Sequence, residues 1–581
     1  MNDTSLSRRN IDFVLHDWLQ IDKKADRETV DAILDLSERL AADQFLTHYK
    51  AADIEEPYLR DGRVHIHPAI GVALRQYAEL GLFSASFPER HGGMELPYSV
   101  CAASFAIFAA ANISTAAYPM LTVANARLIA TFGQESQIET FAKPQIAGRW
   151  FGTMCLSEPQ AGSSLDEVRT RAVFDQSDQL GERYRLSGNK MWISGGDQDV
   201  SENIVHLVLA KIPLADDSLP KGTAGLSLFI VPKILPDESR NDIRVAGLNH
   251  KMGYRGTANC LLNFGEEAGA VGWLIGEPGQ GLRQMFMMMN EARISVGIGA
   301  AAIAGRSYQL ATTYARERLQ GRETGTGERE QVPIIRHADI KHMLLQQKSY
   351  VEGALALTLY CARLVDEASS DADSDALLGL LTPVAKTWSS EYGLSANDIA
   401  IQIHGGYGYT RDFDVEQLWR DNRLNPIHEG TTGIQAKDLL GRKILKDGEG
   451  IPILGRKIAA TVGEAAAHSH FKEQAASLAE AWSSIEHAIT TLSGFHQSKV
   501  FDNATPFLRL FGHVVVAWLW LEQALVTLRL DHLGDSRNDF VDGKRRACHF
   551  FYEFELPQAL ALLPAICAGS DVASGAAAEI F

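Results

Sequence analysis

Apolar and polar residues alternate with a helical period through the first part of the chain. Residues 31–45 (DAILDLSERLAADQF) show this pattern, with few β-branched residues. Residues 100–117 are alanine-rich and almost wholly apolar, which predicts a buried helix. We therefore expect an all-α domain over residues 1–150.

The pattern changes near Phe151, where short β-type runs replace the helical period. Each run is bounded by Gly, Asn, Asp or Pro, and none is long enough to sustain a helical repeat. A compact β domain over residues 151–276 is the simplest interpretation. The runs are, in chain order, GTMCL, RYRLSG, KMWIS, IVHLVLA, LSLFIVP and CLLNF.

Helical periodicity returns at Gly281 and continues in long segments near residues 281–319, 336–369 and 381–404. The number and length of these segments predict an antiparallel four-helix bundle within residues 277–446. The first three expected domains are thus helical, β and helical.

A stretch that contains Gly and Pro, residues 446–454 (KDGEGIPIL), marks a further boundary. Residues 455–581 are again apolar and helical in pattern, and they predict an additional helical domain. Their longest apolar run, residues 514–521 (VVVAWLWL), is far shorter than the roughly 20 residues that a membrane-spanning helix needs. We expect no membrane span.

The composition is typical of a soluble cytoplasmic protein. Hydrophobic residues make up 46% of the 581 and charged residues 22%, close to the average for globular proteins. The 55 Lys and Arg against 72 Asp and Glu give a net charge of −17, so the average field repels a polyanion such as DNA. The six cysteines form no C-x-x-C pair, which argues against a disulfide framework or a zinc site. The first residues lack the layout of a secretory signal.

A pair of glycines follows the last long segment of the expected bundle, in residues 404–409 (HGGYGY). Two adjacent glycines let backbone amides approach an anion closely, as a pyrophosphate site requires. A helix end followed by a turn is the alternative interpretation. Taken alone, this motif favours the interpretation as a helix end followed by a turn.

Five segments, taken together and in order, resemble the signature blocks of the acyl-CoA dehydrogenases. Any one of them could arise by chance, but five in the family's own order are specific. The resemblance covers about residues 70–445. It implies an acyl-CoA dehydrogenase-like fold with an N-terminal helical domain, a central β domain and a C-terminal four-helix bundle, to which this chain adds a helical domain. The segments are 154–172 (MCLSEPQAGSSLDEVRTRA), 190–196 (KMWISGG), 250–258 (HKMGYRGTA), 314–321 (YARERLQG) and 401–435 (IQIHGGYGYTRDFDVEQLWRDNRLNPIHEGTTGIQ).

The resemblance implies that the chain binds FAD, with the flavin against residues of the β domain. Leu156 and Ser157 would hydrogen-bond the pyrimidine end of the flavin. Trp192 would cover one flavin face, and Ser194 would bond near N5, which are contacts that tune a flavin. The W-I-S spacing places Trp192 and Ser194 on one face of a strand, so both can meet one ligand. Core filling is the alternative for Trp192.

The resemblance places the pyrophosphate and adenosine of FAD against residues of the bundle. In the family this site lies partly across a subunit interface, which implies a homodimer or a dimer of dimers. Arginine and glycine amides suit the recognition of phosphate. The residues implied for the pyrophosphate are Arg318, Gln402, Gly405 and Gly406, and those implied near the adenosine or the pyrophosphate are Thr431 and Gly433.

Glu429 stands at the position of the family's catalytic base. Dehydrogenation of an acyl thioester removes a weakly acidic α-proton, which requires a positioned carboxylate. Gly430 would give the backbone freedom beside the reacting carbon. The thioester oxygen would be polarised by a flavin ribityl hydroxyl and by the backbone N–H of Glu429. Some relatives carry the base one residue before the arginine that corresponds to Arg293. That position is Ala292 here, and Glu291 lies about 100° further round the helix, so it should point away.

Besides Gly430, which is implied to lie at the substrate, two residues correspond to substrate contacts in the family. Ser163 would touch the pantetheine arm of CoA, and Arg293 would support substrate and flavin from the bundle. A net acidic protein that binds an anionic CoA ester needs local groups of this kind.

The activity implied is dehydrogenation of an acyl-CoA to the 2-enoyl-CoA. Glu429 would take the α-proton and flavin N5 the β-hydride, and an electron-transfer flavoprotein would be the acceptor. The tail after Lys446 resembles that of long bacterial members, some of which act on 3-(methylthio)propionyl-CoA. That ester and short, medium or long fatty acyl-CoA esters are therefore the candidate substrates.

Two other functions stay open at this point. One relative with an added helical domain is a DNA-binding flavoprotein. Residues 455–581, however, hold ten Lys and Arg against fourteen Asp and Glu, a net charge of −4. Their single basic cluster, Lys544-Arg545-Arg546, is more typical of a solvated face, so we expect no nucleic acid. An oxygen-using relative, such as an acyl-CoA oxidase, is the second alternative. A nitroalkane oxidase would favour Asp over Glu429 as base.

Overall fold

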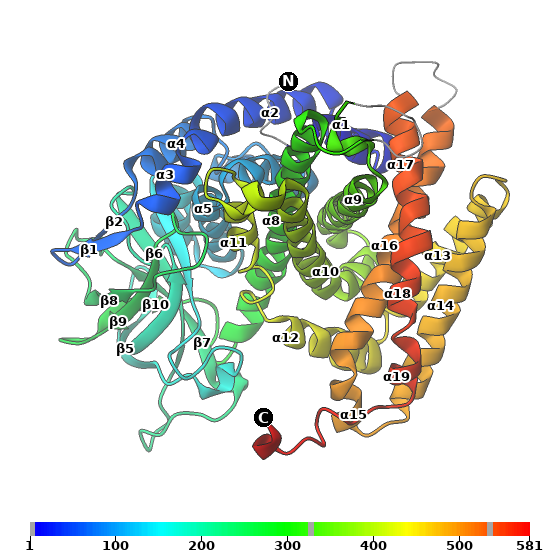
Figure 1. Cartoon of the computed structure of the whole chain (residues 1–581). Helices are drawn as coiled ribbons and strands as arrows, with labels where there is room; N and C mark the ends of the chain where they lie inside the picture. Colours follow the sequence, from blue (N-terminus) through cyan, green and yellow to red (C-terminus); the bar gives the residue numbers. More distant parts are fainter. Residues whose placement is uncertain (1–5, 323–329, 531–537) are drawn as a thin grey trace. The chain divides into compact units, whose positions relative to one another are not determined.

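The computed structural model describes residues 6–322, 330–530 and 538–581 (Figure 1). The chain forms two compact units. We call the first the helical unit; it comprises Met1–Asp31, Tyr98–Ala106 and Val296–Phe581. We call the second the β unit; it comprises Ala32–Pro97 and Ile107–Ser295. Each is described by itself.

The β unit is built around one sheet whose pairings close into a ring. Strand β5 pairs with β4 and β10, β10 pairs with β7, β7 with β6, and β6 with β4. Strand β3 lies parallel to β6, and β9 and β8 continue from β5. All six β-type runs of the sequence coincide with these strands, except that Leu156, the last residue of the first run, follows β3. The strands are β3 (Trp150–Cys155), β4 (Arg171–Asp178), β5 (Gly181–Ser194), β6 (Asn203–Lys211), β7 (Leu226–Pro232), β8 (Ile243–Leu248), β9 (Asn259–Phe264) and β10 (Ala270–Leu274).

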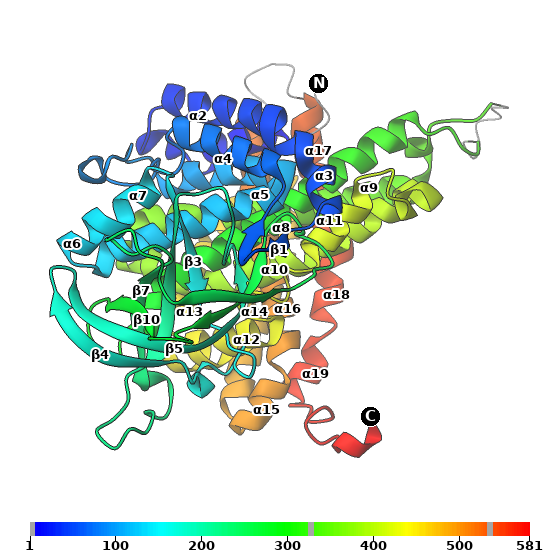
Figure 2. The same ribbon diagram turned by 90° about the vertical axis from the view of Figure 1, so that its left-hand side faces the viewer.

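Helices cover one side of this sheet and form the main core with it. Strands β6 and β7 are buried at every position, which explains why their sequences are continuously apolar. Leu128, Phe141 and Ile146 of the helices pack against Leu207 and Leu228 of the strands. Figure 2 shows α4, α6 and α7 above the strands. The helices that contribute residues to this unit are α2 (Arg27–Leu40), α3 (Tyr49–Ile54), α4 (Pro68–Glu79), α5 (Tyr98–Phe132), α6 (Glu135–Gln137), α7 (Lys143–Ile146) and the first part of α8 (Gly281–Glu317).

The first 150 residues are not wholly helical, which corrects the sequence-based expectation of an all-α domain. Strands β1 (Tyr58–Arg60) and β2 (Arg63–His65) form an antiparallel hairpin. Its turn is Asp61-Gly62, and both residues have positive φ, 51° and 70°. This is the turn geometry that Asp-Gly favours in two-residue hairpins. The pattern of apolar residues did not predict this hairpin, because each of its strands has only three residues.

Long helices form the bundle of the helical unit, as the sequence predicted. Helix α10 begins before residue 381 because Asp371 caps it, accepting hydrogen bonds from Asp373 N and Ser374 N. Helix α12 continues without a break into a π-helical stretch, Asp438–Asp447, and so forms a fourth rod. The helices of this part are α1 (Arg8–Asp12), α8, α9 (Ala338–Ala368), α10 (Ala372–His404), α11 (Val415–Asn422) and α12 (Thr432–Lys437).

The added C-terminal helices pack directly on this bundle. Helix α16 contacts α9, α10 and α12, and Trp520 donates a hydrogen bond to Ser349 O at 3.2 Å. Figure 1 shows α13, α14, α16 and α17 running beside one another. The added helices are α13 (Gly450–Ala466), α14 (Lys472–Ser493), α15 (Gln497–Asp502), α16 (Ala504–Leu530), α17 (Asn538–Phe550), α18 (Leu556–Leu560) and α19 (Leu563–Cys567).

Among the residues that the structure describes, helices α5 and α16 are long and apolar enough to cross a membrane. The apolar windows of these helices are 89% and 94% buried inside the protein. Core helices have this property because neighbours surround them on every side.

The basic cluster Lys544-Arg545-Arg546 does not form the solvated face that its sequence suggested. Lys544 is fully buried, 2.8 Å from a carboxylate oxygen of Glu352. Burial lowers the pKa of Lys544 to about 8, although Glu352 opposes the shift. Arg546 pairs with Asp542 at 2.8 Å. Lys544 therefore serves the packing of α17 on α9, whereas Arg546 stays exposed.

Candidate active site

A buried ion pair fixes the segment that contains Leu156 and Ser157. Lys190 of β5 donates to Glu158 Oε1 and to Leu156 O, both at 3.0 Å. The side chains of Lys190 and Glu158 are 0% and 3% exposed. Thr170 donates to Glu158 from its hydroxyl (2.6 Å) and its backbone N–H (3.0 Å). Burial alone would raise the pKa of Glu158, but the charge of Lys190 and these hydrogen bonds lower it to about 2. Both Leu156 and Ser157 are therefore held by a rigid, charged anchor.

Trp192 occupies a strained position at a bulge in β5. The register between β5 and β9 shifts between Lys190 and Ile193, and Trp192 has φ +66°. A bulky residue in the left-handed region is a genuine outlier, and such strain gathers at functional sites. Its side chain is 58% exposed, which excludes the core-filling alternative within the β unit. Ser194 follows buried Ile193, is half-buried, and accepts a hydrogen bond from Asn259 Nδ2 at 3.3 Å.

The residues implied for substrate lie in different settings of the β unit. Ser163 is exposed in the loop after β3. Arg293 of α8 is buried, with 4% exposure. Glu291 is engaged elsewhere, because Arg127 of α5 donates to its Oε2 at 2.9 Å and also donates to the Ser86 hydroxyl. This ion pair occupies the carboxylate that would be the alternative base.

The glycine pair after α10 leaves open space above the backbone. Gly405 has φ +61°, so the turn itself requires glycine. Gly406 has ordinary φ, and a Cβ built there meets no atom within 4 Å. Gly408 differs, since a Cβ there would lie 2.5 Å from Ile401 O. The fold thus requires glycine at Gly405 and Gly408, whereas Gly406 is exposed and leaves its backbone open to the approach of another molecule.

Arg318 lies beside this glycine turn. It follows the end of α8, is exposed, and its guanidinium lies 5.9 Å from the ring centroid of Tyr407. Gln402, in the last turn of α10, is also exposed. The structure therefore brings Arg318 to the same turn as Gly405 and Gly406, although they are far apart in the sequence.

Glu429 is held in a strained loop between α11 and α12. Its backbone has φ +52°, and Gly430 follows with φ +87°. Gln435 of α12 donates to Glu429 O at 2.9 Å, and buried Lys386 of α10 donates to Gly430 O at 2.7 Å. These bonds hold both carbonyls in place, and Glu429 is half-buried. The left-handed conformation of Glu429 costs energy because it is not a glycine, so the surrounding contacts must enforce it.

His428, next to Glu429, is neutral. Burial and the nearby charge of Lys386 lower its pKa to about 3. One ring nitrogen lies 3.0 Å from Asn425 Oδ1, which suits a neutral ring that donates there. The histidine therefore adds no positive charge beside Glu429.

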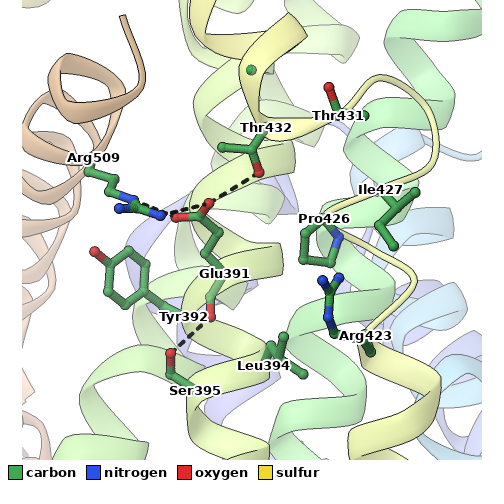
Figure 3. A pocket seen from close by; sticks show the side chains of 11 residues that line it. Glu391, Tyr392, Leu394, Ser395, Arg423, Pro426, Ile427, Thr431, Thr432 and Arg509 are labelled. Carbon is green, nitrogen blue, oxygen red and sulfur yellow. Dashed lines mark hydrogen bonds and ion pairs between the residues drawn. The ribbon is translucent and has the colours of Figure 1, made fainter. Parts of the chain in front are cut away.

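A cavity of about 620 Å³ opens beside Thr431 and Gly433 in the helical unit (Figure 3). A Cβ at Gly433 would meet no atom within 4 Å, so the backbone is accessible there too. Tyr392 and Ile427 supply apolar wall, and Arg423 supplies a cation. Aromatic and apolar walls with a few polar groups are typical of small-molecule sites.

Sequence reasoning missed the residues that hold these sites. The roles of Lys190 and Glu158 had a signal, since both stand in the signature segments. Gln435 also ends a signature segment, whereas Lys386 lies outside all five and carried none, because its task is to bind a backbone carbonyl of the loop. The cavity residue Arg509 comes from the added domain and lies opposite Glu391 only after folding.

Family models match the chain from residue 29 to residue 576. "Acyl-CoA dehydrogenase, N-terminal domain" matches residues 29–149, "middle domain" 153–266 and "C-terminal domain" 279–445. "Acetyl-CoA dehydrogenase C-terminal like" matches residues 454–576, the added helices.

Full-length relatives agree with these matches. The chain is 38% identical to 3-methylmercaptopropionyl-CoA dehydrogenase of Ruegeria pomeroyi, over 86% of this chain and 85% of that protein. It is 31% identical to the broad-specificity linear acyl-CoA dehydrogenase FadE5 of Mycobacterium tuberculosis, over 93% and 92%. Among solved structures, an acyl-CoA dehydrogenase complexed with FAD from Bacillus anthracis has the same fold, with a TM-score of 0.75, 21% identity and coverage of 94% and 88%. The chain belongs to the acyl-CoA dehydrogenase family of FAD-dependent oxidoreductases.

Proposed function

We propose that the protein dehydrogenates an acyl-CoA thioester between Cα and Cβ, with Glu429 as the base that removes the α-proton. The observation that carries this proposal is the strained, clamped loop around Glu429. Gln435 and Lys386 fix two consecutive backbone carbonyls, those of Glu429 itself and of Gly430. A positioned carboxylate is needed because water is too weak a base for this proton. The backbone N–H of Glu429 polarises the thioester oxygen as enolate charge develops.

The residues present suit FAD. Open space above Gly406 and Gly433 allows close approach of a large ligand to the backbone, and Arg318 offers a cation beside the glycine turn. Arg318, Gln402, Gly405 and Gly406 bind the pyrophosphate in this proposal. The remaining cofactor contacts are Thr431 and Gly433 for the adenosine end, and Leu156, Ser157, Trp192 and Ser194 for the flavin. When bound, FAD supplies the acceptor for the β-hydride at N5.

The substrate is an acyl-CoA whose pantetheine arm meets Ser163, with Arg293 in support. Relatives are named for 3-methylmercaptopropionyl-CoA, for butyryl-CoA and for linear acyl-CoA. We therefore propose 3-(methylthio)propionyl-CoA and straight-chain acyl-CoA esters as the first substrates to test. An electron-transfer flavoprotein as acceptor, and a homodimer or dimer of dimers, complete the proposal.

A DNA-binding role is the weaker candidate. Lys544 is buried and Arg546 is paired, so the basic cluster offers little charge to neutralise phosphates.

The test is anaerobic reduction of the bound flavin by a panel of acyl-CoA esters. We expect the yellow absorbance to bleach with at least one ester, and the 2-enoyl-CoA to form in equal amount. Repeating the reaction in air distinguishes an oxidase, which would turn over with oxygen alone. A protein that cannot be reconstituted with FAD would refute the proposal.

A further inference from the structure

One residue of the added C-terminal domain lines the cavity beside Thr431 and Gly433. Arg509 lies near the start of α16, and its Nε donates to Glu391 Oε2 of α10 at 3.0 Å. Thr432 donates to the other carboxylate oxygen of Glu391 at 3.1 Å. Glu391 thus joins the added domain to the segment that follows Glu429 (Figure 3).

The cavity also holds a cation without a protein partner. The guanidinium of Arg423 makes no hydrogen bond or ion pair with any residue that the structure describes. In Figure 3 the Arg423 side chain and the Arg509 side chain lie on opposite sides of Glu391. The charged groups on the wall are Arg423, Arg509 and Glu391, which sum to +1 while Arg509 is present. Without Arg509 the sum is zero, and the carboxylate of Glu391 loses the cation that is paired with it.

We propose that Arg509 is a positioning residue for the phosphate-bearing adenosine end of FAD, and that the added domain thereby completes the cofactor site. The inference rests on the proposed function, in which Thr431 and Gly433 contact this end of FAD. Arg509 acts through Glu391: it neutralises the carboxylate, keeps it turned to one wall, and leaves the cavity net positive. A positive cavity with an aromatic wall matches an adenine nucleotide.

A purely structural role explains the pair less well. The Arg509 side chain is 49% exposed and that of Glu391 is 19% exposed. Ion pairs with this much exposure contribute little to stability. Their effect on an anion bound in the same cavity is direct, because the charge changes at the binding site itself.

The test is a double-mutant cycle on Arg509 and Glu391 in the full-length protein, in which FAD is removed and then titrated back. Arg509→Met should raise the dissociation constant of FAD about three- to tenfold at low salt, the size of one partly exposed charge interaction. Glu391→Gln should lower it or leave it unchanged, because the wall charge rises to +2. The double variant Arg509→Met/Glu391→Gln restores +1 and should return to within about twofold of wild type. Arg509→Lys should stay near wild type.

Two comparisons separate the proposed role from a general loss of structure. ADP should follow the same order as FAD, whereas neutral riboflavin should bind all variants alike. The matched control is Arg456–Asp373, which also joins the added domain to α10 but is 63% and 60% exposed and does not line the cavity. Arg456→Met should leave FAD affinity unchanged.

Three results would overturn the inference. The first is an unchanged FAD affinity in Arg509→Met. The second is an FAD affinity that is weakened equally in Arg509→Met and in Glu391→Gln. The third is a riboflavin affinity that falls as much as the FAD affinity. Each of these leaves the proposed function intact as long as the protein still binds FAD and an acyl-CoA bleaches it. Failure of wild type to bind FAD would instead refute the function itself.

Discussion

Replacing Lys190 by Met tests the anchor of the flavin-side segment. The substitution keeps most of the apolar stem but removes the ammonium group that contacts Glu158 Oε1 and Leu156 O. Glu158 then remains as a carboxylate with 3% exposure and no cation beside it. We expect Lys190→Met to destabilise the β unit strongly.

The magnitude follows from two independent arguments. Removing one partner of a buried ion pair typically costs about 3–5 kcal/mol. The pKa of Glu158 falls from its ordinary 4.5 to about 2 in the folded protein. That interval corresponds to about 3 kcal/mol of stabilisation. Because the folded pKa is the lower one, this contribution is complete above pH 4.5 and is lost as the pH falls toward 2.

The assay is urea unfolding of the full-length protein followed by tryptophan fluorescence, at pH 7 and at steps below pH 5. Lys190→Met should unfold at markedly lower urea than wild type at pH 7. Between pH 4.5 and the acid limit, wild type should lose stability more steeply than Glu158→Gln. The control is Arg149→Met, which breaks an exposed pair with Glu202 and should cost less than about 1 kcal/mol. Equal urea midpoints for Lys190→Met and wild type would refute the reasoning.

Two further predictions concern ligands. Gly406→Ala should weaken FAD binding at least about tenfold without changing the unfolding temperature, since its Cβ meets open space that we assign to the ligand. Gly408→Ala should instead lower the unfolding temperature, because its Cβ would lie 2.5 Å from Ile401 O; the reverse pattern would contradict the assignment. Duplex DNA should show no gel shift at physiological ionic strength, because residues 455–581 are net acidic and Lys544 is buried. A salt-sensitive shift abolished by substituting Arg545 and Arg546 would count against this view.

The strands and long helices were predictable because their apolar patterns are local and continuous. The hairpin at Asp61-Gly62 carried a turn signal but too few strand residues for a pattern. The bulge at Trp192 was not predictable, since its register depends on pairing with β9. The cavity could not be predicted from local sequence, because Glu391 of α10, Arg423 at the end of α11 and Arg509 of α16 meet only through the packing of α11 and α16 on α10. The resemblance supplied Glu429, while the bonds that clamp its loop came only from the structure.

The most direct measurement of the central claim is anaerobic flavin reduction, in a single turnover, by wild type and by Glu429→Gln. The substitution keeps the shape of the side chain and the clamped backbone, so FAD and acyl-CoA should still bind. The rate of flavin bleaching should fall about 10²- to 10⁴-fold, the usual cost of losing a general base. Glu291→Gln is the matched control, because its carboxylate pairs with Arg127 and should not touch the α-proton. Near wild-type bleaching by Glu429→Gln, together with loss of bleaching in Glu291→Gln, would contradict the account.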